Sequence, residues 1–406
     1  MRKALALLLS IVIGSLAFTS SGFAAGFRLP DQDSTAMGMA GAFVGQADNP
    51  SALWYNPSGI TQLDGTTVAA GVMTITPVMK HENNDGSTDV SKRTTHLPVT
   101  LFAVHKMNDQ VAFGLGITNP FGLSTNWSDT SATSQVATFS KIVSIDINPN
   151  VAYKASDRLS FAIGIDYIKL EATMEKLLMG VYNFSLQGDG YGWGANAGAL
   201  WKATDRLSVG LSYRSKVKID VDGTAKVEAM GLSNSAQTNI TLPDLMQVGV
   251  SYKASDNLTM NADLDYTGWS SYDKLTVTSD TIYYLTGTNT STEEKQWKNT
   301  LTFRIGGQYK LSEQWKARAG FVYDQNPVPD DYFDTRVPDS DRQGITIGGG
   351  YANGAMTIDA AYMYLKFKNR TITNSLADDT TMTTTALNGT YTSEAHIVGV
   401  TVAYKF

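Results

Sequence analysis

The residue types that most often carry out chemistry are scarce in this chain. It contains no cysteine and four histidines, His81, His96, His105 and His396. No two of these histidines have the spacing of metal ligands, and none accompanies a recognisable nucleophile motif. The lack of cysteine excludes a disulfide scaffold, a thiol nucleophile and a cysteine-bound metal. We therefore expect no enzyme, no cofactor and no metal site; a hydrolase built on a serine and one histidine is the remaining alternative.

The acidic residues between positions 330 and 341 form the other set that could bind an ion. Asp330, Asp331, Asp334, Asp339 and Asp341 offer oxygen ligands of the kind that Ca²⁺ prefers. They lack the glycine-bearing spacing of a calcium-binding loop, so we interpret them as a solvated loop. The whole chain carries 38 acidic and 32 basic residues. This balance gives no basic footprint for nucleic acid.

Many of the remaining charges alternate with apolar residues. Asp263 and Asp265 do so in one segment, and Arg214, Lys216 and Lys218 do so in another. Such alternation predicts β-strands with one apolar face and one polar face. We expect the apolar face to contact lipid and the charged face to line a lumen. The opposite arrangement would cost about 2–4 kcal/mol for each basic residue at the middle of a bilayer.

A turn that recurs along the chain indicates how these strands are joined. The segment 153–159 reads YKASDRL and returns as WKATDRL at 201–207 and as YKASDNL at 252–258, with a looser copy at 309–315. Each copy connects two alternating runs through a short polar turn, which is the pattern of a β-hairpin. The chain is therefore predicted to form one large antiparallel sheet.

Fourteen segments are long enough to be strands of this sheet, and an even number is typical of bacterial barrels. They lie near 66–80, 95–107, 109–123, 138–154, 157–176, 189–202, 206–222, 240–253, 257–273, 296–310, 314–325, 341–353, 355–369 and 392–406. Short turns alternate with longer polar connections near 81–94, 124–137, 177–188, 223–239, 274–295, 326–340 and 370–391. This asymmetry favours an all-β fold, a 14-stranded antiparallel transmembrane β-barrel.

The N-terminus indicates export. Arg2 and Lys3 precede a short apolar stretch, and small residues up to Ala24 suit cleavage after that position. The stretch is too short to span a bilayer, so residues 1–24 are predicted to be a secretory signal peptide. Its removal leaves 30 basic against 38 acidic residues, a net charge of −8. We expect the protein in the outer membrane of a Gram-negative bacterium, in contact with membrane lipid and lipopolysaccharide.

Residues 25–64 do not alternate and are rich in small residues. They are interpreted as a hatch of short helices that plugs the barrel, with an exposed periplasmic tail as the alternative. A barrel of fourteen strands is wide enough to hold water unless something fills it. The predicted organisation is thus a signal peptide at 1–24, a hatch at 25–64 and a barrel at 65–406.

Aromatic residues mark the ends of the expected strands, as in the interfacial girdle of a membrane barrel. They are Tyr153, Trp201, Tyr252, Trp269, Tyr309 and Trp315. The last strand alternates apolar residues and ends in Phe406. This ending is interpreted as the signal that the barrel-assembly machinery reads during biogenesis.

Motifs spread over nearly the whole exported chain resemble those of the FadL family of outer-membrane transporters for long-chain fatty acids and other hydrophobic compounds, which includes TodX-type hydrocarbon channels. The matching pieces are Ala25-Gly26-Phe27, Asn56-Pro57, 190–194, 213–220, Leu242-Pro243-Asp244, 266–270, 327–329 and 338–342. Each piece alone is weak, and their order and number make the resemblance specific.

The resemblance implies a monomeric barrel closed by an N-terminal hatch. Ligand would be captured on the extracellular side, bind near Phe27 and leave sideways through a gap at a kinked third strand. Asn56 and Pro57 match the hatch motif of the family, although the next residue is serine where the family has alanine. The segment Asn119, Pro120, Phe121 and Gly122 lies where the family has its kink, the lateral gate. A break there has a physical cause, because proline lacks a ladder donor and glycine tolerates a bulge. A strand end entering a loop is the alternative.

Lys176 matches a basic position that meets the ligand carboxylate in the fatty-acid transporters of the family, and Lys295 is the choice for the second such position. A strand-end lysine that reaches water or lipopolysaccharide phosphate is the alternative for Lys176. The resemblance thus implies ligand-gated, passive uptake of a long-chain fatty acid or a similar hydrophobic molecule, without a cofactor. The alternatives are uptake of monoaromatic or alkane hydrocarbons by the same fold, and a general porin or adhesin.

Overall fold

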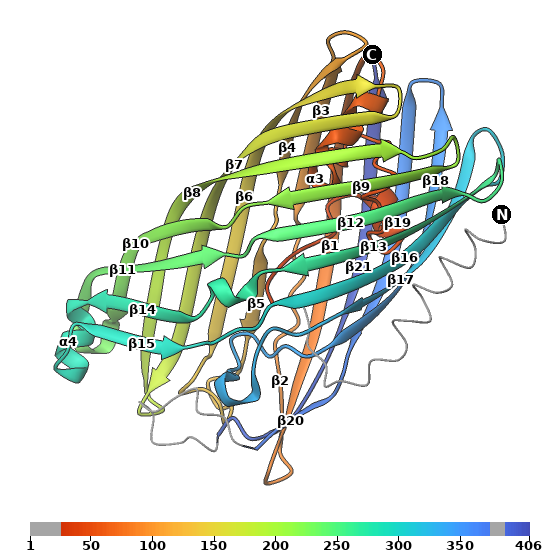
Figure 1. Cartoon of the computed structure of the whole chain (residues 1–406). Helices are drawn as coiled ribbons and strands as arrows, with labels where there is room; N and C mark the ends of the chain where they lie inside the picture. The colour runs from red at the N-terminus through yellow and green to blue at the C-terminus, as the bar shows by residue number, and fades with distance from the viewer. Residues whose placement is uncertain (1–25, 374–385) are drawn as a thin grey trace.

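The strands close into one barrel in the computed structural model, which describes residues 26–373 and 386–406. The predicted signal peptide lies outside these residues. The wall has fourteen antiparallel strands, as the alternation predicts, and the first strand pairs with the last from Thr67 opposite Lys405 to Asn83 opposite Gly389 (Figure 1). No helix in the described ranges is long and apolar enough to cross a membrane.

Nine of the wall strands are continuous and five are broken into two pieces. The continuous strands are β1 (Thr66–Asn83), β3 (Val99–Lys106), β6 (Phe139–Ser156), β7 (Leu159–Leu178), β8 (Tyr182–Lys202), β17 (Trp315–Asp324), β18 (Arg342–Asn353), β19 (Met356–Phe367) and β21 (Gly389–Lys405). The broken strands are β4 (Val111–Thr118) with β5 (Gly122–Asn126), β9 (Leu207–Arg214) with β10 (Val217–Val227), β11 (Leu232–Leu242) with β12 (Leu245–Lys253), β13 (Leu258–Thr267) with β14 (Lys274–Ser279), and β15 (Thr290–Glu294) with β16 (Thr300–Lys310).

Short elements complete the part of the chain that the structure describes. They are β2 (Thr88–Val90), β20 (Arg370–Ile372), α2 (Ser34–Met37), α3 (Ala52–Tyr55), α4 (Asp280–Thr286), η1 (Pro57–Gln62), η2 (Glu228–Met230), η3 (Trp269–Ser271) and η4 (Asp330–Tyr332). The strand pieces β10, β11, β14 and β15 continue the wall beyond the level of the hatch and carry α4 at their far end (Figure 1).

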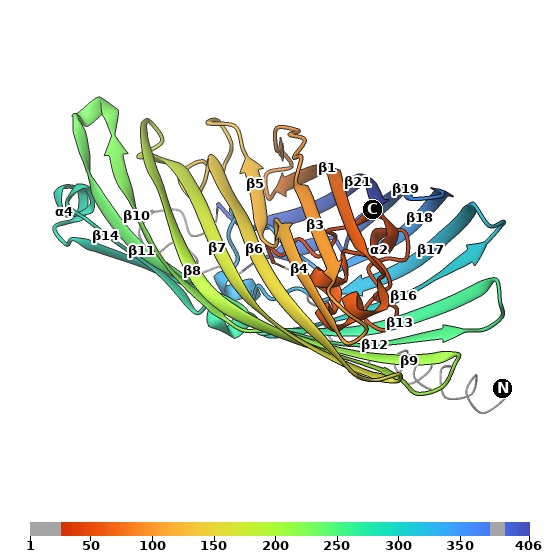
Figure 2. The ribbon, with the colours of Figure 1, turned by 90° about the horizontal axis from the view of Figure 1, so that it is seen from above.

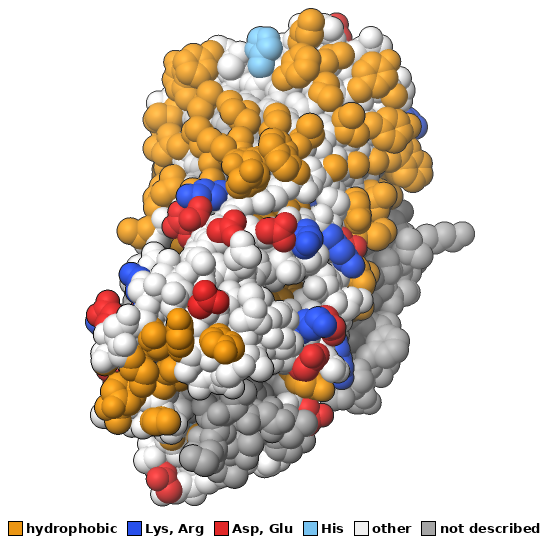
Figure 3. Space-filling model, turned by 90° about the vertical axis from the view of Figure 1, so that its left-hand side faces the viewer, with side chains coloured by type: hydrophobic (Ala, Val, Ile, Leu, Met, Phe, Trp, Pro, Cys, Tyr) orange, Lys and Arg blue, Asp and Glu red, His pale blue; other side chains and the backbone are white. Residues whose placement is uncertain are grey.

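This extension of the wall replaces much of what the sequence suggested as loops. The connections expected near 177–188 and 223–239 are largely strand, and the one near 274–295 consists mainly of β14, α4 and β15. β7 shows where the wall leaves the lipid, because its outward face is apolar up to Tyr167 and charged from Lys169 onward. The strand therefore continues past the lipid belt into water. The change from apolar to charged residues on its outward face marks the edge of the lipid belt, and the strand itself ends further on. Figure 3 shows the apolar belt bordered by a band of acidic and basic side chains.

The charged face predicted around Arg214 changes sides at a strand break. Arg214 is buried inside the barrel, as expected, whereas Lys216 and Lys218 are exposed on the outside and Val217 is buried. Two residues separate β9 from β10, and they shift the alternation by one position. A one-residue shift moves every following side chain to the opposite face. The interpretation of Lys216 and Lys218 as lumen residues was therefore wrong.

The hatch fills the lumen with short helices and turns. Figure 2 shows its helices α2 and α3 inside the ring of strands. Asp33 caps α2 by accepting hydrogen bonds from Thr35 N and Ala36 N at 3.0 and 3.2 Å. Met37, Phe43 and other hatch side chains are fully buried. Backbone amides at hatch turns are satisfied by the wall, because Asp263 of β13 accepts hydrogen bonds from two of them.

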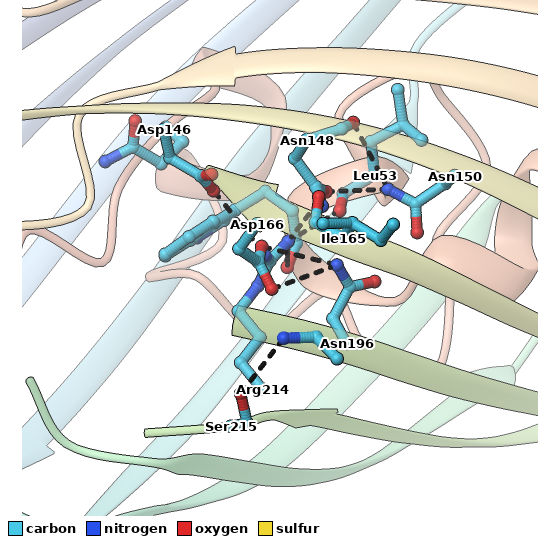
Figure 4. Close-up of polar contacts among 12 residues, drawn as sticks. Leu53, Asp146, Asn148, Asn150, Ile165, Asp166, Asn196, Arg214 and Ser215 are labelled. Atoms are coloured by element: carbon cyan, nitrogen blue, oxygen red, sulfur yellow. Dashed lines mark hydrogen bonds and ion pairs between the residues drawn. The ribbon is translucent and has the colours of Figure 1, made fainter. Parts of the chain in front are cut away.

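Arg214 of β9 joins the hatch to two other strands of the wall, β6 and β7. Its guanidinium group forms an ion pair with Asp166 of β7 and lies 3.5 Å from Asp146 of β6 (Figure 4). The same group donates a hydrogen bond to the carbonyl oxygen of Leu53 at 2.8 Å and stacks over the Trp54 ring at 4.6 Å. Buried charges need such partners, because an isolated one is costly to desolvate. This network fixes α3 against the wall.

Candidate functional site

The N-terminal end of the hatch runs beside the break between β4 and β5. Leu29 N–H donates to the Pro120 carbonyl oxygen at 2.8 Å, and Gly122 N–H donates to the Phe27 carbonyl oxygen at 2.9 Å. Arg28 and Phe121 form an antiparallel bridge between these two hydrogen bonds. The hatch thus provides ladder partners at the place where the wall is broken.

The break has the geometry of a bulge. Thr118 is opposite Asp146 and Gly122 is opposite Val143, so three residues on the broken strand face two on β6. Pro120 has no N–H to donate to a ladder, which gives the irregularity a direct cause. A side chain at position 122 would also collide with the hatch, since a Cβ atom there would lie 2.7 Å from Leu29 Cδ1.

Beyond the break the third wall strand has a partner on one side only. β4 pairs with β3 as far as Ile117, whereas β5 pairs with β6 and has no strand on its other edge within the described residues. Asn119 spans this opening with its side chain: Val99 N–H donates to its Oδ1 atom at 3.1 Å, and its Nδ2 atom donates to Ser144 O at 2.9 Å. We call this opening, between β3 and β5, the lateral gap.

Phe27 occupies an aromatic cluster inside the barrel, next to the lateral gap. Its ring centroid lies 4.7 Å from Trp269, 5.6 Å from Trp297, 5.9 Å from Tyr272 and 5.9 Å from Phe121. Phe27, Phe121, Trp269 and Trp297 are all buried. Trp269 was predicted to belong to the interfacial girdle, and this is wrong because the chain leaves the sheet after Thr267 and turns the indole inward. The sequence carried no signal for the part that Tyr272 and Trp297 play here.

A cavity of about 620 Å³ passes through the lateral gap. Leu97, Val99 and Val143 line it and are exposed on the outer surface of the wall, whereas Leu29 and Met363 line it from the inside. Its size falls within the range of sites for small ligands. We call it the lateral cavity.

The inner end of the lateral cavity is charged. Arg342 donates to Asp324 Oδ2 through Nε at 3.0 Å and through Nη2 at 2.9 Å. Asp339 comes from the loop between β17 and β18 and accepts a hydrogen bond from Gly26 N–H at 2.7 Å. Burial raises the pKa of Asp339 to about 7, although Arg342 and the Gly26 amide favour its ionised form. The apolar lining therefore ends at a polar patch built by the hatch, the wall and this loop.

The residues suggested by the hatch motif lie elsewhere. Asn56 Nδ2 donates to the carbonyl oxygens of Val44 and Ala199, each at 3.0 Å, and Pro57 begins η1. Both residues are buried against β8, where a Cβ atom on Gly198 would lie 2.9 Å from Pro57 Cδ. They anchor the hatch to the wall on the side away from the residues that line the lateral cavity.

The two suggested carboxylate ligands lie in the extension, outside the lateral cavity. Lys176 belongs to β7 and Lys295 follows β15, and both attract Glu293 electrostatically. The buried Lys295 ammonium group donates to Asp334 at 2.6 Å and to Glu293 at 2.9 Å. The structure thus brings both lysines to one carboxylate, and it provides Lys295 with two protein partners.

The remaining candidates for chemistry do not converge. No group of three or more histidine, aspartate or glutamate side chains in the described ranges is arranged to hold a metal ion. The acidic segment was interpreted as solvated, yet Asp334, Asp339 and Asp341 are buried. Each is tied to a different partner: Asp334 to Lys295, Asp339 to Gly26, and Asp341 to the Tyr323 hydroxyl group at 3.2 Å. The loop therefore packs into the barrel mouth, where these three carboxyl groups are held by other groups of the protein.

A barrel with an apolar outer belt, a plugged lumen and an apolar cavity through its wall is an outer-membrane transport barrel. The chain belongs to the family described as outer membrane protein transport protein (OMPP1/FadL/TodX), whose model matches residues 15–406. The N-terminal, kink and loop segments quoted for the resemblance all lie within the match, and the expected location in the outer membrane is confirmed.

Relatives and solved structures agree with this assignment. The chain is 25% identical to the long-chain fatty acid transport protein of Escherichia coli O6:H1, over 87% of this chain and 90% of the relative. It is 27% identical to outer membrane protein P1 of Haemophilus influenzae, over 75% of this chain and 74% of the relative. Among solved structures, a FadL homologue of Pseudomonas aeruginosa matches with a TM-score of 0.82 and 23% identity, covering 94% of this chain and all of the other. The Pseudomonas putida toluene transporter TodX matches with a TM-score of 0.72 and 17% identity, covering 92% and 98%.

Proposed function

We propose that this protein takes up long-chain fatty acids, or similar hydrophobic molecules, across the outer membrane by passive diffusion and releases them sideways into the bilayer. The lateral cavity is the observation that carries this proposal, because its lining joins the hatch to residues exposed on the lipid-facing side of the wall. A cavity that is mostly apolar favours a ligand that is mostly apolar. The relatives named as long-chain fatty acid transport proteins support the substrate class.

Phe27 is proposed to hold the place of the ligand in the resting state. Its ring fills an aromatic cluster, and its carbonyl group is hydrogen-bonded to Gly122 at the lateral gap. A hydrophobic ligand that enters the cluster would displace the ring and, with it, the backbone that pairs with the break. The segment 119–122 would then act as the lateral gate, and ligand binding would open it.

The lysines of the extension are proposed to act earlier, during capture. The inward side chains of β10, β11 and β14 form an apolar cluster near the far end of the extension, including Val227, Ala236 and Val277. Lys176 lies next to this region and would attract a fatty-acid carboxylate, with Lys295 as a second cation whose partners Asp334 and Glu293 compete with the ligand. Their role as carboxylate ligands stays a prediction.

Two other functions remain as alternatives. The first is uptake of a neutral monoaromatic or alkane hydrocarbon through the same lateral cavity, which a toluene transporter among the structural neighbours supports. The second is a general porin or adhesin. The buried packing of Met37, Phe43 and Leu53 inside the lumen argues for a plugged barrel that conducts few ions in planar bilayers. We further propose that the protein works as a monomer and that the barrel-assembly machinery inserts it.

Uptake of radiolabelled oleate by Gram-negative cells without their own fatty-acid transporter tests the proposal. Pro120→Val combined with Gly122→Val is designed to restore a ladder donor and to crowd the bulge, so we expect uptake to fall at least tenfold while the barrel still folds. Deletion of Phe27 is expected to impair uptake as well. A matched control combines Pro149→Val in β6 with Gly349→Val in β18, where a Cβ atom meets nothing closer than 3.7 Å.

Resistance of the folded barrel to unfolding by sodium dodecyl sulfate at room temperature shows that each variant is assembled. Unchanged uptake in both gate variants would contradict lateral release. Uptake of toluene without uptake of oleate would move the protein to the hydrocarbon alternative. Steady ion conductance of the wild-type protein would instead favour a general porin.

A further inference from the structure

Asp31 is a buried acid of the lateral cavity with one carboxyl oxygen that the described residues leave without a partner. It follows Pro30 in the hatch, lines the cavity and is 9% exposed. Its Oδ1 atom is shielded from solvent and has no hydrogen-bond partner within residues 26–373 and 386–406. A buried carboxyl group without a partner is costly, and in native proteins it usually takes up a proton or binds something. Asp31 therefore has an unused capacity to accept or share a hydrogen bond in the cavity.

The cations around Asp31 are already committed to other carboxylates. Arg304, Arg342 and Arg28 attract it at longer range. Arg304 Nε donates to Asp265 at 3.0 Å, and Arg28 Nη1 lies 3.4 Å from the same carboxylate. Arg342 makes two hydrogen bonds to Asp324.

This arrangement sets the charge of the inner end. The guanidinium groups of Arg28, Arg304 and Arg342 face the carboxyl groups of Asp31, Asp265, Asp324 and Asp339, and Arg370 also attracts Asp339. An incoming anion would add a fifth acidic group where the guanidinium nitrogens named above already contact carboxylates, and Arg28 Nε would be the donor left for it, because this atom has no hydrogen-bond partner among the described residues. A headgroup that donates a hydrogen bond would satisfy Asp31 without adding charge.

We propose that Asp31 binds the headgroup of the ligand in the lateral cavity by accepting a hydrogen bond from a hydroxyl group. Two ligands carry this chemistry, a long-chain alcohol and a fatty acid in its protonated form. With a fatty acid, the two carboxyl groups share one proton, as carboxyl pairs in contact do. The inference rests on the proposed function and specifies the form in which the substrate crosses the wall.

An uncharged headgroup also fits the direction of release. The outer part of the lateral cavity is lined by Leu97, Val99 and Val143, which are exposed toward lipid. A carboxylate that passes these residues would lose both its water shell and its protein partners, at a high cost in free energy. Lys141 lies at the outer mouth of the cavity and is exposed, so it is the competing position for an anionic headgroup.

Binding of matched ligands to the purified protein in detergent tests the proposal. Oleyl alcohol and methyl oleate have the same chain, and only the alcohol donates a hydrogen bond. We expect the wild-type protein to bind oleyl alcohol about tenfold more tightly than methyl oleate, the effect of about one hydrogen bond to a buried acid. Asp31→Leu is expected to remove this preference, and Asp256→Asn, at an exposed turn, to leave it unchanged. Asp31→Asn is the second variant, to be measured if Asp31→Leu does not fold. It retains an acceptor oxygen, so we expect it to keep most of the preference for oleyl alcohol.

A second comparison separates the two ligands. Oleate affinity is measured at pH 5 and at pH 9 for the wild-type protein and for Asp31→Leu. The ratio of the wild-type affinity to the Asp31→Leu affinity is then compared at the two pH values, because this ratio cancels the effects of pH on free oleate. A ratio that falls about tenfold at pH 9 supports a shared proton and assigns the protonated fatty acid. A constant ratio overturns the fatty acid and leaves the alcohol as the ligand.

Equal affinity of the wild-type protein for oleyl alcohol and methyl oleate would overturn the proposal. The proposal would also be overturned if Lys141→Gln weakened oleate binding and Asp31→Leu left it unchanged. The headgroup would then lie at the outer mouth of the cavity, beside Lys141. Either result can occur in a protein that still takes up oleate, in which case the transport function stands. Failure to bind any of these ligands would instead contradict the transport function.

Discussion

Gln32 of the hatch and Asn119 of the broken wall strand exchange two hydrogen bonds. Asn119 N–H donates to Gln32 Oε1 at 3.0 Å, and Gln32 Nε2 donates to the Asn119 carbonyl oxygen at 3.0 Å. The same amide nitrogen donates to Leu29 O at 2.8 Å. One side chain thus satisfies the backbone of the residue that spans the lateral gap, and it ties the gap to the hatch.

Gln32→Ala is predicted to loosen the lateral gap. The change leaves the Asn119 N–H and carbonyl groups without their partner, at a cost of about 1–3 kcal/mol for the local structure. We expect faster hydrogen exchange of the amides at 119–122 and faster release of bound oleate, with the barrel still folded. Exchange measured by mass spectrometry on the protein in detergent reports the first effect.

Gln62→Ala provides the matched control. Its side-chain amide donates to Gln46 O and Ala47 O at 2.9 and 3.0 Å, so it bonds within the hatch alone. This variant is expected to leave exchange at 119–122 unchanged. Equal exchange in all three proteins would mean that Gln32 does not hold the gap.

The closed wall and its two faces followed from local patterns, because each strand repeats its alternation many times. Asp263 and Asp265 were placed in the lumen correctly, and both are buried there. The prediction of inward and outward faces was wrong beyond Arg214, because the two residues between β9 and β10 shift the alternation by one position. Strand pattern alone does not reveal such a shift, since both registers alternate equally well.

The candidate site depended on contacts between distant parts of the chain. Phe27 and the break at Pro120 could be singled out through the family resemblance and the chemistry of proline. Trp269 lies 242 positions after Phe27 and its role came only from the fold, which places the two rings 4.7 Å apart. Asp31 has no local pattern that marks it, because its significance comes from an Oδ1 atom that no other described residue contacts through a hydrogen bond.

Asp339 is predicted to make stability depend on pH near neutrality. Its pKa is raised to about 7, chiefly by burial, while Arg342, Gly26 N–H and Arg370 favour the ionised form and Asp324 opposes it. The folded state therefore holds this proton more tightly than the unfolded chain. The resulting stabilisation is complete below the ordinary pKa of an aspartate and is lost as pH rises to about 7, by up to roughly 1.4 kcal/mol per pH unit.

The free energy of unfolding in urea, measured from pH 4 to pH 9, checks this dependence against Asp339→Asn. The wild-type protein is expected to lose stability relative to the variant between about pH 4 and pH 7 and to level off above that. Asp256→Asn is a control at an acid that is 99% exposed and lies at a turn outside this loop. A difference between the wild-type protein and Asp339→Asn that stays constant with pH would contradict a raised pKa.

Lys176→Ala is predicted to distinguish charged from neutral substrates during capture. Removing a partly exposed cation weakens attraction for a carboxylate by about 1 kcal/mol or less, equivalent to a fewfold loss of oleate affinity. Methyl oleate, which carries no charge, should bind as before. Lys226→Ala on the exposed face of β10 is the matched control. Loss of affinity for both ligands would indicate a packing role for Lys176 instead.

Arg214→Met is predicted to destabilise the plugged barrel strongly. It leaves the buried carboxylates of Asp166 and Asp146 without their cation and breaks the hydrogen bond to Leu53 of the hatch. Removing one partner of a buried ion pair typically costs about 3–5 kcal/mol. We expect a lower urea midpoint and bursts of ion conductance as α3 separates from the wall.

Adding Asp146→Asn and Asp166→Asn to Arg214→Met should recover much of the stability, because neutral amides do not need a counterion. Arg158→Met, at an exposed turn, should have no effect. If the triple variant stays as unstable as Arg214→Met, the hydrogen bond to Leu53 and the stacking on Trp54 hold the hatch, and the ion pairs contribute little.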